Sequence, residues 1–361
     1  MGASDLVDVR RIGDEDPGAD DIVERGARLG ERALDDAEAD PRLLVRARRR
    51  VSVPGHDRRG PGDPDVVSGA NGARVADALL ERRSRRNALA LHMGSVAAVD
   101  ALRQVDGWPC EHVAVAVTGR VDATYGDLDR RFPWASVSKL ATTVAMLVAA
   151  EEGLVDLDEA AGPPGSTIRH LLAHASGLPF EAGAPIARPG TRRIYSNYGF
   201  EVGAAHVEEQ AEMSFADYFA AVWAGTGAVL EGSAGAGVEG TVGDLVALAR
   251  ELQRPARIAQ ETLDEARSVQ FPGLTGVLPG FGRQEPNDWG LGLELRDGKS
   301  PHWTGTRNAP GTYGHFGRSG TFLWVDPDAG IALACLTDLA FGDWAADAWP
   351  RLADAVLSEL G

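Results

Sequence analysis

The sequence predicts an α+β fold, in which an antiparallel β-sheet is flanked by helices and an all-helical subdomain is inserted between its strands. Strand-like segments lie at residues 112–117 and again between 289 and 336, whereas the region from about 167 to 265 is mostly helical. Short turns join neighbouring strand segments. Because a tight turn joins antiparallel strands, this order indicates an antiparallel sheet interrupted by helices.

The first elements follow in chain order. After a helical stretch at Val96–Val105, the apolar run His112–Val117 predicts a strand that enters a hairpin. Residues Val137–Leu154 are apolar on nearly every face, which predicts a helix buried on all sides. Farther on, Thr241 and Asp244 have the spacing of a capping box and predict the start of another helix.

Strands return near the C-terminus. The segment Trp289–Leu295 alternates glycine or charge with bulky residues, and Asp326–Gly330 supplies turn residues between the strand segments Thr321–Val325 and Ile331–Leu336. A last amphipathic helix follows. Its apolar stripe consists of Trp349, Leu352, Val356 and Leu360.

The chain divides into two regions of different composition. Residues 1–92 are dense in Asp, Glu, Arg, Gly and Pro, and are too poor in apolar residues to form a core. We therefore expect a low-complexity, disordered N-terminal extension at 1–92 and one folded domain at 93–361. The inserted helical subdomain is expected at roughly 150–285 of that domain.

Composition and charge exclude several classes of function. With 44% hydrophobic and 25% charged residues in 361, the chain resembles an ordinary water-soluble protein. Its net charge of -17 argues against a nucleic-acid partner, which needs excess Lys and Arg. No run approaches the ~18 apolar residues of a membrane span, and the acidic N-terminus does not resemble an export signal. Cys110 and Cys335 lack metal-type spacing, so we expect a cytoplasmic protein without metal or disulfide.

A Ser-x-x-Lys motif stands at the start of the helix that is predicted to be buried. Ser136 would lie at its N-terminal end, where free backbone N–H groups favour negative charge, and Lys139 would project from the same face. A desolvated lysine can act as a base or as a charge that lowers a neighbour's pKa. These features predict Ser136 as a nucleophile. The alternative is an ordinary helix cap with a solvated lysine.

A Tyr-x-Asn motif follows at Tyr195 and Asn197, where another helix is expected to begin. A cationic Lys139 beside the phenol would lower the pKa of Tyr195, which could then relay a proton. The Asn197 amide could orient Lys139 or a substrate carbonyl. The alternative is a buried tyrosine followed by a helix-capping asparagine.

A glycine-rich segment, Gly314–Gly320, precedes the terminal hairpin. Its glycines would allow a strand edge to approach a substrate, with Gly317 and His315 at the wall of the site. The backbone N–H of Arg318 could pair with that of Ser136 as an oxyanion hole. The alternative is a glycine-rich lead to a hairpin with an incidental histidine.

Several other patterns are weaker candidates. His170 and His174 have the spacing of metal ligands on a helix, but no glutamate completes the zinc-protease pattern. Gly235–Gly240 fits the dinucleotide fingerprint, but it lies in a Gly/Ala/Ser-rich stretch without a clear preceding strand. Ser138 has no lysine three residues later, so Ser136 is favoured. No Gly-x-Ser-x-Gly motif of an α/β-hydrolase occurs.

Taken in order, the Ser-x-x-Lys, Tyr-x-Asn and His-x-Gly motifs resemble those of class C β-lactamases, DD-peptidases and β-lactamase-like esterases. Residues Ile168–Pro179 also resemble the helix and turn that follow the nucleophile helix in that family. The resemblance covers about Val113 to the C-terminus. It implies an active site between the sheet and the helical subdomain, with acyl-enzyme chemistry at Ser136, Lys139 and Tyr195. Which of Lys139 and Tyr195 is the acylation base stays open.

The third motif departs from the family pattern. Many members have Lys-Thr-Gly where this chain has His315-Phe316-Gly317. The lysine charge and the threonine hydroxyl, two contacts for the carboxylate of a β-lactam or peptide, are therefore missing. We predict a cofactor-free serine hydrolase of small-molecule esters or amides, with esters favoured and with no nucleic-acid or membrane partner. The alternatives are a β-lactamase or D-amino-acid peptidase, and a non-catalytic binding or sensing module of the same fold.

Overall fold

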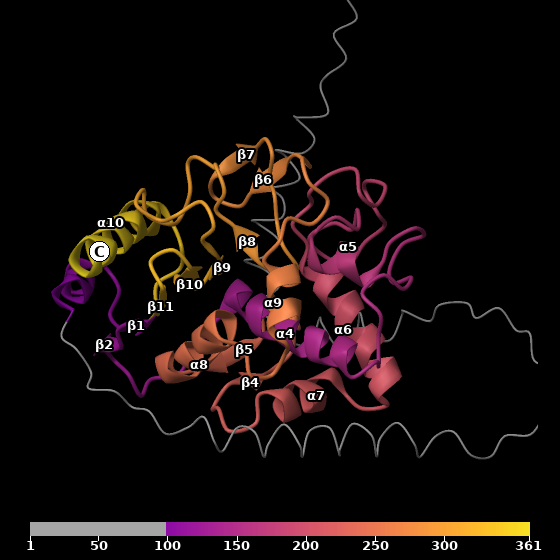
Figure 1. The fold of residues 1–361 in the computed structure, drawn as a ribbon, viewed down its shortest axis with the longest axis horizontal. Helices are drawn as coiled ribbons and strands as arrows, with labels where there is room; N and C mark the ends of the chain where they lie inside the picture. Colours follow the sequence, from indigo (N-terminus) through magenta and orange to yellow (C-terminus); the bar gives the residue numbers. More distant parts are fainter. Residues whose placement is uncertain (1–98) are drawn as a thin grey trace, which may run out of the picture. The chain divides into compact units, whose positions relative to one another are not determined.

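The computed structural model describes residues 99–361. Their centre is a six-stranded antiparallel sheet with strand order β2-β1-β11-β10-β9-β8 (Figure 1). Helices cover this sheet, which confirms the predicted α+β class, whereas the predicted extension at 1–92 lies outside the described residues. The six strands are β1 (Val113–Gly119), β2 (Ala123–Gly126), β8 (Glu294–Leu295), β9 (Tyr313–Gly317), β10 (Thr321–Asp326) and β11 (Ile331–Thr337).

Along the sequence, most of the helices and the remaining short strands lie between β2 and β8. A three-stranded sheet has the order β3-β5-β4, and β6 pairs with β7. These strands are β3 (Phe132–Pro133), β4 (Val229–Leu230), β5 (Val238–Gly240), β6 (Gly276–Leu278) and β7 (Gly282–Gln284). The helices are η1 (Asp100–Gly107), η2 (Ala135–Val137), α4 (Ser138–Glu151), α5 (Ile168–Leu172), α6 (Asn197–Ala211), α7 (Phe215–Val222), α8 (Val242–Gln253), α9 (Gln260–Ala266) and α10 (Asp343–Leu360).

Strands β9, β10 and β11 are buried on both faces of the six-stranded sheet, whereas the edge strand β2 is partly exposed. On β10, Leu323 and Val325 belong to the core cluster shared with α4 and α8. Phe322 and Trp324 face the other cluster, which contains the apolar side chains of η1 and α10. This alternation follows from the period of two in a strand, and it separates the helical side of the sheet from the α10 side.

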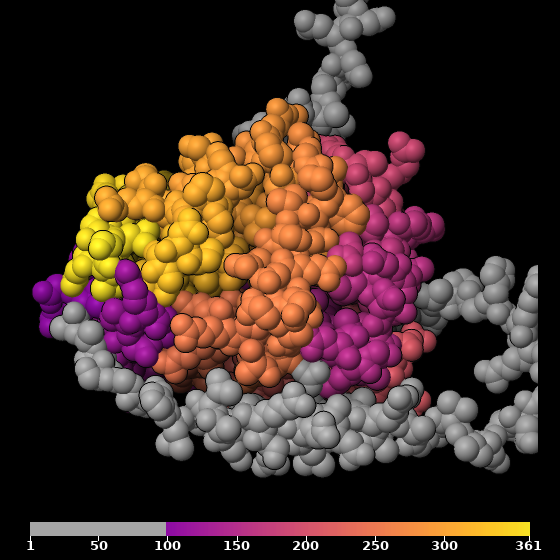
Figure 2. All heavy atoms as spheres, in the orientation of Figure 1, coloured from indigo at the N-terminus to yellow at the C-terminus, as the bar shows by residue number. Residues whose placement is uncertain are grey.

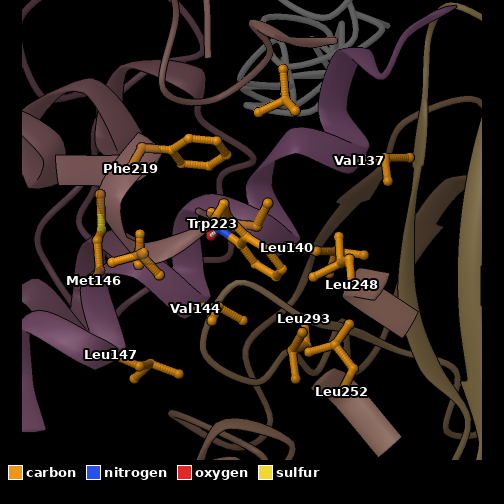
Figure 3. Close-up of a cluster of buried hydrophobic side chains, with 14 of the residues drawn as sticks. Val137, Leu140, Val144, Met146, Leu147, Phe219, Trp223, Leu248, Leu252 and Leu293 are labelled. Atoms are coloured by element: carbon orange, nitrogen blue, oxygen red, sulfur yellow. Dashed lines mark hydrogen bonds between the residues drawn. The ribbon is translucent and has the colours of Figure 1, made fainter. Parts of the chain in front are cut away.

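The helix α4 is the centre of the larger core. Every residue from Ser138 to Ala149 is buried, as its apolar sequence predicts. Figure 3 shows its side chains beside Trp223, which follows α7, and beside α8 and Leu293. The indole N–H of Trp223 donates to the Ala141 carbonyl at 3.1 Å. These contacts fix the N-terminal end of α4, which contains Lys139 and follows Ser136.

Two of the predicted elements differ from the structure. The helical stretch expected at Val96–Val105 is a 3-10 helix at Asp100–Gly107, as far as the described residues reach. The strand expected at Trp289–Leu295 is reduced to its last two residues. The reason is a turn, because Gly292 has a φ of 64° and the Gly290 N–H donates to the Leu293 carbonyl at 2.9 Å.

Other local predictions are confirmed. Thr241 caps α8 in a capping box, in which its side chain and that of Asp244 each accept a backbone N–H. In α10, Trp349, Leu352 and Val356 are buried against the sheet. In the part of the chain that the structure describes, no helix has the length and apolar character needed to cross a membrane.

The two ends of the described region lie side by side. Figure 2 shows the first described residues and the C-terminal helix at the same side of the molecule. The Glu359 carboxylate accepts the backbone N–H groups of Asp100 and Ala101 at 2.9 and 2.8 Å. These bonds stabilise the N-terminal end of η1, where the orphan N–H groups of a helix favour an anion.

Candidate active site

Ser136 lies in η2, directly before α4, and its side chain is partly exposed. The preceding residue, Ala135, has a φ of 45°, a conformation that costs a residue with a Cβ atom about 1–2 kcal/mol. Two hydroxyls hold this turn, one from the β9–β10 turn and one from the first residue of β10. Thr321 Oγ1 donates to the Trp134 carbonyl at 2.9 Å, and Ser319 Oγ donates to that of Pro133 at 2.7 Å. The serine is therefore fixed against the end of β9.

Lys139 is fully buried in the first turn of α4. Its Nζ donates to Ser136 Oγ at 3.3 Å, to the Gly235 carbonyl at 2.9 Å and to Asn197 Oδ1. Burial lowers the pKa of Lys139 to about 7, although the nearby Glu201 carboxylate acts in the opposite direction. With this pKa, about half of the Lys139 side chains carry a neutral amine near pH 7. That amine lies in contact with the Ser136 hydroxyl, which it would deprotonate.

Tyr195 completes a three-residue group with Ser136 and Lys139. The Lys139 Nζ lies 4.7 Å from the centre of the phenol ring, over its face. Burial raises the pKa of Tyr195 above its usual value, and a hydrogen bond with Ser136 acts against this rise. The expectation that Lys139 lowers this pKa is therefore wrong. Desolvation of the phenolate is the larger effect, and Tyr195 stays protonated at neutral pH.

The second motif lies where the chain enters α6. The N-cap is Ser196, whose Oγ accepts the Gly199 N–H at 2.9 Å, and not Asn197. Asn197 is instead the first residue of the helix, and its Oδ1 accepts a hydrogen bond from Lys139. Asn197 Oδ1 therefore contacts Lys139, as one of its two expected roles requires, and the role itself stays a prediction.

Arg193 anchors the segment that carries Tyr195. Its guanidinium is buried, and burial lowers its pKa to about 10. Asp288 lies 4.0 Å away. The guanidinium N–H groups donate to four backbone carbonyls, those of Ala173, Gln270, Phe271 and Asn287. The Arg193 side chain thus connects the segment before Tyr195 to three loops that are distant in sequence. No local sequence pattern indicates this role.

His315 lies on β9 at the wall of the site, 5.7 Å from Tyr195 between ring centres. Its Nδ1 is 2.6 Å from the Phe316 carbonyl, which can only accept, so the proton is on Nδ1. Burial, with a contribution from Lys139, lowers the pKa of His315 to about 3. The ring is therefore neutral near pH 7. Phe316 points to the opposite side of the sheet, into the α10 core.

Gly317 is the place where β9 passes closest to the nucleophile turn. A Cβ atom on Gly317 would lie 2.5 Å from the Trp134 carbonyl oxygen and 2.5 Å from Thr321 Oγ1. Only glycine fits this approach. Arg318 follows in the turn to β10, and its carbonyl accepts the Phe341 N–H at 2.7 Å. Its own N–H as an oxyanion donor stays a prediction.

We expect Gly317→Ala to lower kcat/KM for a p-nitrophenyl ester by about 10- to 100-fold, because the added methyl group separates β9 from the Ser136 turn. Steady-state kinetics and thermal melting measure the effect. Gly311→Ala is the matched control, since its Cβ would meet only Pro327 Cγ, at 3.7 Å. A Gly317→Ala variant with unchanged kinetics would show that this close approach is unimportant for turnover.

Two weaker candidates have structural roles. Ser138 is buried, and its Oγ accepts the Val238 N–H at 2.9 Å, so its hydroxyl is not accessible to a substrate. His170 lies against the Phe271 ring, 4.1 Å between ring centres. Within residues 99–361, the group of acidic and histidine side chains close enough to share a metal ion is Glu111, His112 and Asp338, which excludes both candidate histidines.

Sequence reasoning also missed the contacts that His174 and Gly235 make at the site. His174 is buried 4.7 Å from the Tyr195 ring, and its Nδ1 accepts the Ser196 N–H at 3.2 Å. It lies in the segment 168–179 that carries the family resemblance, which was the available signal. Gly235, from the apparent dinucleotide fingerprint, provides the carbonyl that binds Lys139. Nothing in the local sequence indicates that contact.

The chain is similar to a known protein family and to several solved structures. The beta-lactamase family model matches residues 97–226 and 220–357. A structure of a protein from Mycobacterium bovis described as a beta-lactamase is 50% identical, with a TM-score of 0.71, and the match covers 72% of this chain and 99% of that one. No curated protein matches.

More distant structures share the fold. The simvastatin synthase LovD from Aspergillus terreus is 16% identical, with a TM-score of 0.60 over 72% of this chain and 99% of that one. A penicillin-binding protein from Bacillus halodurans is 16% identical, with a TM-score of 0.55 over 69% and 98%. Together with the family match and the Mycobacterium bovis relative, these similarities show that the chain belongs to the beta-lactamase family of serine hydrolases.

Proposed function

We propose that this protein hydrolyses small-molecule esters through an acyl-enzyme on Ser136. The observation that carries the proposal is the contact of 3.3 Å between Ser136 Oγ and a buried Lys139 whose pKa is lowered to about 7. The neutral amine accepts the serine proton, and the serine oxygen attacks the ester carbonyl. The alcohol then leaves with a proton, and water releases the acid from the enzyme.

The third motif supports esters over substrates that carry a carboxylate. His315 occupies the position of the family's lysine, and it is neutral because its pKa is lowered to about 3. Phe316, at the position of the threonine, packs against Phe341 and Trp349 on the far side of the sheet. A β-lactam carboxylate would therefore lose a charged contact and a hydroxyl contact at this wall.

A second candidate is turnover of β-lactams or D-amino-acid peptides. It is favoured by the 50% identity to the Mycobacterium bovis protein that is described as a beta-lactamase. The family match does not separate this activity from ester hydrolysis, and the neutral His315 is the observation that favours the ester. A binding or sensing module is the alternative without turnover.

The test compares kcat/KM for p-nitrophenyl acetate and butyrate with that for a chromogenic cephalosporin. We expect the esters to be favoured by at least about 10- to 100-fold, the equivalent of one lost charge-assisted hydrogen bond. The Ser136→Ala variant serves as the blank for each substrate. Preferred turnover of the cephalosporin would replace the ester proposal with the lactamase one, and a folded protein inert toward all substrates would indicate the binding module.

We further propose that the protein acts in the cytoplasm on a small molecule, without a cofactor and without a nucleic-acid or membrane partner. The net charge of -17 supports the exclusion of nucleic acid. Cys110 and Cys335 are both free thiols, which suits a reducing compartment. Cell fractionation with an antibody to the full chain tests the localisation.

A further inference from the structure

Glu201 lies on α6 one helical turn after Asn197, on the same side of the helix. Its carboxylate reaches the turn at residues 233–237. There Glu201 Oε1 accepts a hydrogen bond from Ser233 Oγ and, at 3.4 Å, from the Gly235 N–H. The carboxylate therefore holds a turn that is far away in sequence.

The turn held by Glu201 is the one that binds Lys139. The Gly235 carbonyl accepts a hydrogen bond from Lys139 Nζ at 2.9 Å. The turn is closed by the Gly237 N–H, which donates to the Ser233 carbonyl at 2.7 Å. It also packs tightly on α6, since a Cβ atom on Gly235 would lie 3.3 Å from Asn197 Oδ1. Glu201 and Lys139 thus bind the two backbone polar groups of one residue.

The titratable groups around Lys139 come from several elements. Glu201 lies on α6, Tyr195 precedes α6, His174 follows α5 and His315 lies on β9. Burial lowers the pKa of both histidines and raises that of Tyr195, so these three groups are uncharged near pH 7. The Glu201 carboxylate raises the pKa of Lys139 and so limits the effect of burial.

We propose that Glu201 is a positioning residue for Lys139: its carboxylate fixes the turn 233–237 that receives the lysine ammonium, and it places a negative charge beside that ammonium. The proposal rests on the proposed function, in which Lys139 activates Ser136. Removal of the charge makes the ammonium less stable, so the amine becomes available at lower pH. A residue with a purely structural role would not move that ionisation.

The chain allows a direct measurement, because Lys139 and Lys299 are its two lysines. The full-length protein is labelled with ¹³C at the lysine Cε atoms and titrated by NMR, which follows each amine without any turnover. In Glu201→Gln we expect the pKa of Lys139 to fall by about one unit. Lys299 is buried in an ion pair with Glu294 at 2.7 Å, and its signal is the internal reference.

Glu209→Gln is the matched control. Glu209 is an exposed residue of the same helix, and its substitution removes the same charge. We expect no movement of the Lys139 titration in this variant. If Glu201→Gln does not fold, Glu201→Asp replaces it, because the shorter side chain withdraws the charge from Ser233 and Gly235 and should give a smaller fall in the same direction.

Kinetics give the second readout. In Glu201→Gln the acid limb of kcat/KM for a p-nitrophenyl ester should move to lower pH with Lys139, which raises activity at pH 6 by about fivefold. An unmoved Lys139 titration in Glu201→Gln and Glu201→Asp would overturn the proposal even in an active esterase. A moved titration in a protein that hydrolyses no ester would support it and would overturn the proposed function instead.

Discussion

Ser136→Ala is expected to abolish covalent labelling by a fluorophosphonate probe and to reduce ester turnover by at least about 10³-fold, on the scale of other nucleophile deletions. The Ser136 Oγ is the partly exposed hydroxyl that contacts Lys139, at 3.3 Å. Its loss leaves the amine with no proton to accept and the substrate with no acyl acceptor. Intact mass and peptide mass spectrometry locate the adduct in the wild type.

The neighbouring serine provides the matched control for this variant. Ser138→Ala removes an acceptor from the buried Val238 N–H, so it should destabilise the fold by about 1–3 kcal/mol. It should leave labelling at Ser136 intact. The assignment would fail if Ser136→Ala kept its label or near-normal turnover, or if the label lay on Ser138.

The parts of the site that could be predicted from sequence are those encoded by short spacings. Ser136 and Lys139 are three residues apart on a helix start, and α4 is apolar all round, so both the motif and its burial are local properties. Tyr195 and Asn197 are similar, because their relation to α6 depends on a capping serine between them. The family resemblance then predicted that these motifs form a single active site.

The other features of the site depend on contacts between residues that are far apart in the sequence. Gly235 meets Lys139 across 96 positions of sequence, and the Arg193 guanidinium binds carbonyls up to 94 positions away. No periodicity encodes such pairs. The direction of the Tyr195 pKa shift could not be predicted from sequence either, because it depends on how far the folded chain buries the phenol.

Lys139→Met is expected to lower kcat/KM by about 10²- to 10⁴-fold, the usual contribution of a general base. Methionine keeps the length of the buried side chain and removes the amine, so α4 should remain packed. The Gly235 carbonyl and Asn197 Oδ1 lose their donor, which should lower stability by about 1–3 kcal/mol. Ester kinetics and thermal melting separate these two effects.

The pH profile of the wild type then decides which residue is the base. Lys139, with a pKa of about 7, must lose its proton to act, so kcat/KM should rise through about pH 7 and level off above it. Tyr195 has a raised pKa, so a tyrosinate base would instead place the rise above pH 10. We expect the rise near pH 7 to be absent from Lys139→Met. If the variant kept that rise, or if the wild type showed it only above pH 10, Lys139 would supply charge and not the base.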